Sequence, residues 1–208
     1  MKKLKILLVS GCDKKQEEFG KYAFATIKSY ATKWKYDFKT YTDKDFYFTL
    51  GIGIDSLEQQ SDKQTQQQRA FNWNKVSIVA SNLYDYDYVL WLDADTFIMK
   101  NDEPIEKIFE LEKNPTKHFF LTVDAESLNV GVFLVKNTPE MHLLFREWCN
   151  MGFLQNDYYT IGLSSGQKIC FYEQAAFSQL YYKNWNNLMV LTQILSQEKI
   201  NGHLQKEF

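Results

Sequence analysis

Apolar and polar positions alternate in blocks along the 208-residue chain, and the blocks have the lengths of strands and helices. Residues 4–9 and 88–92 are nearly continuous apolar runs, which are typical of strands buried on both faces. Residues 19–30 and 69–84 place apolar side chains at helical spacing, whereas residues 36–42 are rich in aromatic and β-branched side chains. The first half of the chain therefore predicts alternating strands and helices.

The second half continues this alternation. It predicts strands at residues 119–123, 130–135 and 188–191 and helices at 139–149 and 173–183. The Gln-rich segment 55–68 is typical of a solvent loop or the start of a helix. Together the pattern predicts a three-layer α/β fold, with a mostly parallel central sheet flanked by helices and ligands at the carboxyl ends of its strands. The length fits one domain over residues 1–208.

Composition and charge exclude several classes of function and location. A net charge of -2 provides no broad basic surface, so nucleic acid is not an expected partner. No apolar stretch reaches the roughly 18 residues of a transmembrane helix. The three cysteines are too few and too scattered for a disulfide framework and indicate reduced thiols, so we predict a soluble cytoplasmic protein. Residues 1–12 look superficially like a lipoprotein signal, but the apolar run is shorter than the roughly 7–15 residues of a secretory signal and favours a first strand.

An acidic pair follows the second apolar run. Asp93 and Asp95 leave the end of that predicted strand one residue apart, and alternate residues of a strand face the same side. Both carboxylates could then bind one hard divalent cation, Mg²⁺ or Mn²⁺, which prefers oxygen ligands and bridges a diphosphate to an acidic site. The alternative is that these acids only cap the turn after the strand.

Four segments resemble one family in the expected order. Residues 90–99 (LWLDADTFIM) are similar to the Asp-x-Asp strand of glycosyltransferases with the GT-A fold, and most resemble the fungal and plant galactosyl/xylosyl-type enzymes with the same Trp-Leu-Asp-Ala-Asp motif. Residues 71–75 (FNWNK) resemble the family's Trp-x-Lys helix, and 128–133 (LNVGVF) its strand beside the donor sugar. Residues 172–177 (YEQAAF) resemble the start of the helix under the reacting centre. The resemblance implies that the whole chain is one GT-A catalytic domain.

The resemblance also implies roles for single residues. Lys75 would contact the donor diphosphate, Asn129 and Gln174 would lie at the donor, and Glu173 would be catalytic. Three of these residues also have a simpler interpretation, because Lys75 could be a solvated helix residue, Asn129 a turn residue, and Glu173 an acid stabilised by the helix dipole. The family has an acid where Tyr172 stands, which leaves Glu173 as the single carboxylate at this point.

Four further positions complete the predicted site. His203 and Lys206 resemble the C-terminal tail with which many GT-A enzymes close over the metal and diphosphate, so His203 would join Asp93 and Asp95 as a metal ligand. Ser10 and Asp43 follow the first two predicted strands, a position suited to the nucleoside.

These features predict a metal-dependent glycosyltransferase that uses a nucleoside-diphosphate sugar, most simply a UDP-sugar, and a hydroxyl of a glycan or glycolipid as acceptor. Metal-bound Asp95 and the base or charge of Glu173 would carry the chemistry. One alternative is a nucleotide-sugar or metal-binding module without transfer activity, such as the donor half of a larger enzyme, with other domains or subunits. A nucleotidyltransferase shares the paired acids, but the segment after residue 9 has only one glycine, Gly11, where a glycine-rich loop is expected.

Overall fold

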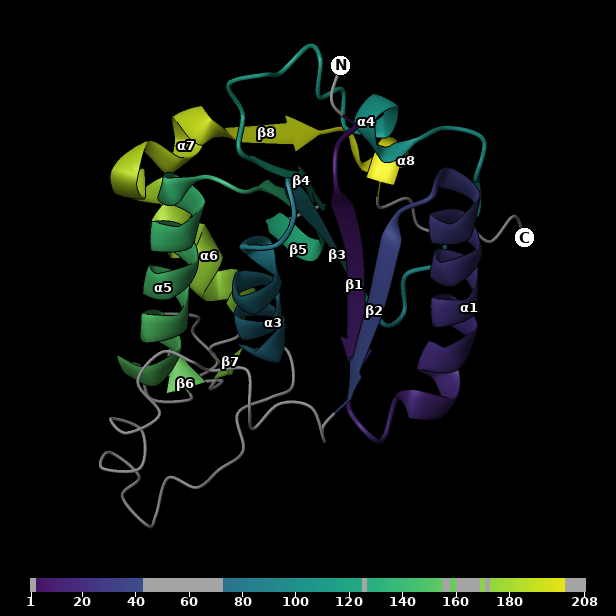
Figure 1. Ribbon diagram of the computed structural model, residues 1–208. Helices are drawn as coiled ribbons and strands as arrows, with labels where there is room; N and C mark the ends of the chain where they lie inside the picture. Colours follow the sequence, from purple (N-terminus) through teal and green to yellow (C-terminus); the bar gives the residue numbers. More distant parts are fainter. Residues whose placement is uncertain are drawn as a thin grey trace, which may run out of the picture.

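The computed structural model describes residues 3–42, 73–124, 127–154, 158–159, 169–170 and 173–200. In these ranges a central six-stranded sheet has the order β2-β1-β3-β5-β4-β8 (Figure 1). Its strands are β1 (Ile6–Cys12), β2 (Asp37–Thr42), β3 (Tyr88–Asp93), β4 (Phe119–Val123), β5 (Leu128–Lys136) and β8 (Thr192–Leu195). Strand β5 alone runs against the others, so the sheet is mostly parallel, as predicted.

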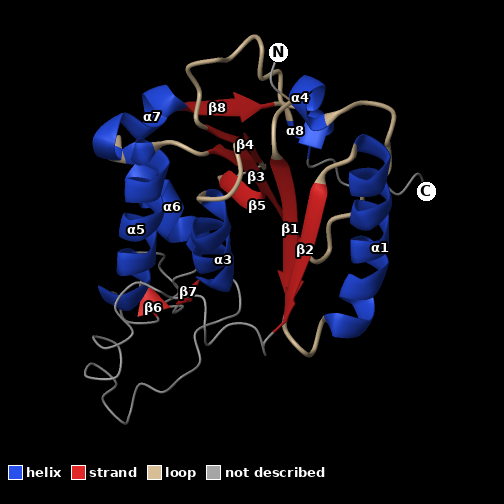
Figure 2. Cartoon of the chain, in the orientation of Figure 1, coloured by secondary structure: helices blue, strands red, loops and turns tan. Residues whose placement is uncertain are grey.

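Helices cover both faces of this sheet (Figure 2). One face packs against α3 (Asn74–Leu83), α5 (Pro139–Leu154) and α6 (Glu173–Tyr182). The other packs against α1 (Glu17–Trp34), α4 (Ile105–Ile108) and α8 (Gln197–Ile200). A small second sheet pairs β6 (Tyr158–Tyr159) with β7 (Ile169–Cys170). The predicted three-layer α/β architecture is confirmed.

Alternation along the strands explains why each face has its own core. In β3, Val89 and Trp91 point into the core under α3, α5 and α6, whereas Leu90 and Leu92 point toward α1. Residues buried on both faces produce the continuous apolar run that the sequence shows for this strand. Asp93 continues the side of Val89 and Trp91, so its carboxylate faces α3 rather than α1.

A β-bulge interrupts the pairing of β4 and β5 near the end of β3. Leu121 pairs with Phe133, but the next residue, Thr122, pairs with Asn129. The residues 130–132 thus have no partner on β4, and their backbone groups need other hydrogen-bond partners. This irregular stretch of β5 lies beside the carboxyl end of β3.

One predicted strand is wrong. The structure has a helical turn, α7 (Leu188–Leu191), where the sequence predicted a strand, and β8 begins at the next residue. The 3-10 turn η3 (Trp185–Asn187) precedes α7, and Asn184, Asn186 and Asn187 have left-handed backbone angles. Of the apolar run only Leu188 is buried, whereas Met189 and Val190 are exposed, and such one-sided burial suits a helix as well as a strand.

The remaining predicted elements are confirmed within a few residues at each end. The segment 55–68 and residues 69–72 of the predicted third helix lie outside the described residues. Across the described ranges, every helix is too short or too polar to cross a membrane.

Phe177 provides a test of what fixes helix α6, which also carries Glu173 and Gln174. Its buried ring stacks on Phe119 at 4.8 Å and lies 4.9 Å from the Trp148 ring. We expect Phe177→Ala to lower the free energy of unfolding by about 3–5 kcal/mol, because it leaves a cavity. Urea denaturation measures this loss. Tyr182→Ala, which truncates an exposed ring on the same helix, should cost less than about 1 kcal/mol, and equal losses would show that α6 is not held by this cluster.

Candidate active site

The acidic pair lies where β3 leaves the sheet. Asp93 is the last residue of β3, and a turn closed by a 2.9 Å hydrogen bond from the Thr96 N–H to the Asp93 carbonyl follows it. Asp95 is in this turn with an exposed side chain, whereas the Asp93 side chain is 36% exposed. The strand ends two residues before Asp95, so strand alternation does not place the two carboxylates on one face, and Asp95 lies in the turn instead.

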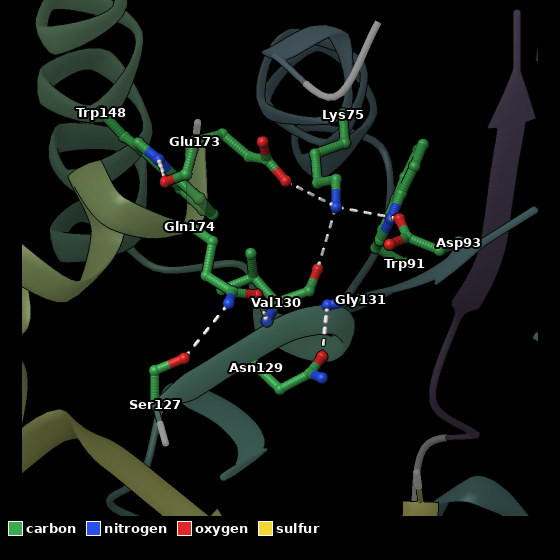
Figure 3. A network of polar contacts seen from close by, with 10 residues as sticks. All are labelled: Lys75, Trp91, Asp93, Ser127, Asn129, Val130, Gly131, Trp148, Glu173 and Gln174. Carbon is green, nitrogen blue, oxygen red and sulfur yellow. Dashed lines mark hydrogen bonds and ion pairs between the residues drawn. The ribbon is translucent and has the colours of Figure 1, made fainter. Parts of the chain in front are cut away.

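Lys75 connects Asp93 to a second carboxylate (Figure 3). Its Nζ lies 2.9 Å from Asp93 Oδ1 and 2.9 Å from Glu173 Oε1. The same ammonium donates to the Val130 carbonyl at 3.3 Å. Lys75 is on α3, Asp93 on β3, Val130 on β5 and Glu173 on α6, so one buried side chain joins four elements. The solvated-lysine alternative is excluded, because Lys75 is 3% exposed.

The charge state of Lys75 follows from its partners. Burial alone would lower the pKa of the Lys75 ammonium, but the carboxylates of Asp93 and Glu173 outweigh burial, so its pKa is raised above the ordinary value. The lysine therefore stays charged at neutral pH. One positive and two negative charges leave the group with a net negative charge at the end of β3.

Trp91 holds the same oxygen of Asp93 from the strand itself. Its indole N–H donates to Asp93 Oδ1 at 2.7 Å, and Lys75 Nζ lies 5.8 Å from the centre of its ring. Among the described residues, both side-chain partners of Asp93 contact Oδ1. The sequence reasoning did not assign Trp91 a role, although it alternates with Asp93 on one side of the strand and that spacing could have indicated the contact.

Asn129 and Gln174 provide hydrogen bonds to the bulge in β5. The Gly131 N–H donates to Asn129 Oδ1 at 2.8 Å, and the Val130 N–H donates to Gln174 Oε1 at 3.2 Å. Gln174 Nε2 in turn donates to Ser127 Oγ at 3.3 Å. Two side chains that the sequence placed at the donor therefore stabilise backbone groups that the bulge removes from the sheet. A contact between Asn129 or Gln174 and the donor stays a prediction.

Glu173 begins α6 and is almost completely buried. It is 3% exposed, and its backbone carbonyl accepts a 2.8 Å hydrogen bond from the Trp148 indole. While Oε1 binds Lys75, Oε2 is a buried oxygen without a hydrogen-bond partner in the described part of the chain. An ordinary helix-terminal acid is solvated, so this arrangement differs from the simpler interpretation. A buried oxygen with free lone pairs is suited to accept a hydrogen bond from a bound hydroxyl.

Ser10, another predicted site residue, does not join this group. Ser10 is fully buried inside β1, and it pairs with Leu92, whose side chain faces α1. By strand alternation its hydroxyl lies on the opposite face of the sheet from Lys75. Asp43, His203 and Lys206 fall outside the described residues.

The residues at the end of β3 fit a hard divalent cation in their donor chemistry. Asp95 has an exposed carboxylate, and Asp93 Oδ2 lies next to Gly131, where a Cβ would come within 3.1 Å of it. The missing side chain at Gly131 thus leaves space beside an oxygen that the Lys75 and Trp91 contacts do not use. Within the described ranges no cluster of three or more His, Cys, Asp or Glu side chains forms a metal site, so a third protein ligand would have to come from the rest of the chain.

The chain matches no protein-family model and no curated protein sequence. Its structure is similar to that of a glycosyltransferase involved in the glycosylation of the major capsid of PBCV-1, with a TM-score of 0.63, 14% identity, and 95% of this chain and 85% of that chain covered. It is also similar to mouse xyloside xylosyltransferase 1, with a TM-score of 0.55, 12% identity and coverages of 94% and 86%.

A third similar structure is the glycosyltransferase GlyE of Streptococcus pneumoniae, with a TM-score of 0.54 and 13% identity. This match covers 94% of the chain but only 46% of GlyE. At these identities the similarities show a shared fold, which agrees with the α/β fold expected from the resemblance to GT-A enzymes.

Gly131→Ala tests the close approach of β5 to Asp93. The new Cβ would lie 3.0 Å from Asn129 Oδ1 and 3.1 Å from Asp93 Oδ2, so we expect the variant to lose about 1–3 kcal/mol of unfolding free energy in urea denaturation. Gly20→Ala on α1 is the matched control. Its Cβ would meet the Cys12 sulfur at 3.2 Å, and better helix propensity offsets the contact. Equal stability of the two variants would contradict the tight packing at Asp93.

Proposed function

We propose that this chain is a metal-dependent glycosyltransferase that moves a sugar from a nucleoside-diphosphate sugar, most simply a UDP-sugar, to a hydroxyl of a glycan or glycolipid. The observation that carries the proposal is the group of Asp93, Lys75 and Glu173 at the carboxyl end of β3, next to exposed Asp95. In mostly parallel α/β sheets ligands bind at this edge. The fold shared with glycosyltransferase structures, including a xyloside xylosyltransferase, supports this assignment. We extend the proposal to a galactosyl/xylosyl-type activity on the resemblance of residues 90–99.

Asp93 through Oδ2, Asp95 and His203 are the residues proposed to hold Mn²⁺ or Mg²⁺. A bound divalent ion would stabilise the negative charge that develops on the departing diphosphate. Lys206 would add a positive charge to the same diphosphate. Asp43 and Ser10 were expected at the nucleoside, and with Ser10 on the far face of the sheet only Asp43 is retained for that role.

Glu173 is proposed to act on the sugar rather than on the metal. During transfer the bond from the anomeric carbon to the diphosphate breaks, the acceptor oxygen forms a new bond to that carbon, and the acceptor proton leaves. A carboxylate beside the sugar could stabilise positive charge on the ring or take this proton. Its buried Oε2, which has no hydrogen-bond partner among the described residues, supports either role.

A donor screen tests the proposed function. Nucleotide release from a panel of UDP-, GDP- and CDP-sugars would be measured with Mn²⁺ present, with and without glycan acceptors. We expect turnover with at least one donor, stimulated by an acceptor. If UDP and Mn²⁺ bind but no donor turns over, the alternative of a binding module or donor half of a larger enzyme is correct. The observation that favours this alternative is that the chain aligns with only 46% of GlyE.

Asp95→Asn tests the exposed acid. The amide keeps the size of the side chain but removes the charge that a hard cation prefers, so Mn²⁺-dependent turnover should fall by about 100-fold or more. The melting temperature should stay close to that of the wild type, because Asp95 is exposed. Asp102→Asn changes another exposed acid seven residues later and should retain full turnover. Wild-type turnover in Asp95→Asn would remove Asp95 from the metal site.

A deletion of residues 201–208 tests the proposed tail ligands His203 and Lys206. Removing them should weaken UDP binding in the presence of Mn²⁺ by about 10-fold, while the melting temperature changes little, since chain ends carry few core contacts. Isothermal titration calorimetry measures the affinity. The single change His203→Ala should reproduce most of the loss. Equal UDP affinity of the deletion variant and the wild type would show that the tail provides no ligand.

A further inference from the structure

All three protons of the Lys75 ammonium have acceptors inside the protein. An ammonium group has three donors, and here they are matched by Asp93 Oδ1, Glu173 Oε1 and the Val130 carbonyl. The Lys75 side chain is 4% exposed. A phosphate oxygen could bind this ammonium only by displacing one of these acceptors and leaving it buried without a partner, which is costly. The geometry therefore disagrees with a direct contact between Lys75 and the donor diphosphate.

The same contacts decide which carboxylate oxygens remain available. Asp93 Oδ1 is occupied by Lys75 and Trp91, while Oδ2 lies beside Gly131. Glu173 Oε1 is occupied by Lys75, while Oε2 has no hydrogen-bond partner in the described part of the chain. Each carboxylate thus has one oxygen held by the lysine and one left for other chemistry. A carboxylate held at one oxygen has lost the freedom to rotate, which is how neighbouring residues orient reactive groups.

The lysine is also what allows two acids to lie close together in this part of the protein. Two carboxylates in a partly buried setting repel each other, and a shared cation between them removes that repulsion. Glu173 is on α6 and Asp93 on β3, and among the described residues no other cation forms an ion pair with either of them. Without Lys75 the two elements would be pushed apart at the site.

We infer that Lys75 is a positioning residue, which fixes Asp93 and Glu173 relative to each other and does not bind the donor. This inference rests on the proposed transferase function for its kinetic consequences. Its structural part, a charge-mediated link between α6 and β3, is independent of any substrate.

The test compares Lys75→Met, Glu173→Gln and the double variant, with Lys28→Met as the control for loss of an exposed lysine. Thermal unfolding is measured first. In the wild-type background Glu173→Gln should lower the melting temperature, because it leaves Lys75 with one carboxylate. In the Lys75→Met background it should raise the melting temperature, because it removes one of two repelling acids. Glu173→Gln shifts of the same sign in both backgrounds would overturn the link.

Kinetics and UDP binding separate positioning from donor contact. In Lys75→Met we expect kcat to fall by about 100-fold while the donor KM changes by less than about 3-fold, because binding groups remain but the reacting geometry is lost. If Lys75→Met does not fold, the double variant takes its place, because it keeps the net charge of the wild-type cluster. The reference for the double variant is Glu173→Gln. Its UDP affinity should match that of Glu173→Gln within about 3-fold. A loss of about 10-fold or more would show a direct contact with the diphosphate and overturn the inference.

A failure of the proposed transferase function can be distinguished from a failure of the inference about Lys75. If the wild-type protein neither turns over a nucleotide sugar nor binds UDP, the proposed function is wrong, whereas the opposite signs of the two melting-temperature shifts would still establish the link between α6 and β3. Lys28→Met should behave as the wild type in every measurement.

Discussion

A single buried ammonium organises the end of the sheet where the chemistry is proposed. Lys75 enters from α3 and reaches a strand end, a bulge and a helix start at the same time. A buried ion pair contributes little net stability against water, but removal of one partner leaves a buried charge uncompensated. The lysine therefore matters mainly for geometry. Because its contacts are buried, the relative position of Asp93 and Glu173 is fixed by the core of the protein and not by a loop.

The bulge in β5 depends on this arrangement and contributes to it. By leaving the ladder of β4, residues 130–132 expose two N–H groups and a carbonyl that must find partners. Gln174, Asn129 and Lys75 provide them. The bulge also brings Gly131, which has no side chain, next to Asp93 Oδ2. Irregular backbone, two amides and one ammonium thus form a connected polar network beside the carboxyl end of β3.

Features that depend on residues close together along the chain could be predicted from the sequence, whereas contacts between distant segments could not. The run of residues 88–92 is apolar because both faces of β3 are buried. The strand, and the position of the acids at its carboxyl end, could therefore be predicted without a structure. Residues 188–191 were misassigned because a short apolar run does not distinguish a helical turn from a strand. The pairing of Lys75 with Glu173 depends on how α3 and α6 pack, and no local pattern reports that contact. Resemblance placed both residues near the donor but assigned Lys75 a phosphate contact, whereas its described partners are carboxylates and a carbonyl.

The site combines two acidic environments that suit different tasks. Asp95 is exposed and can meet an ion that keeps part of its hydration shell, as Mg²⁺ and Mn²⁺ complexes of diphosphates do. Glu173 is buried, where a charge is poorly screened, so it would act strongly on a sugar bound beside it as proposed. Lys75 provides Glu173 with a counter-charge that it shares with Asp93, so the buried acid is paired but one ammonium faces two acidic side chains.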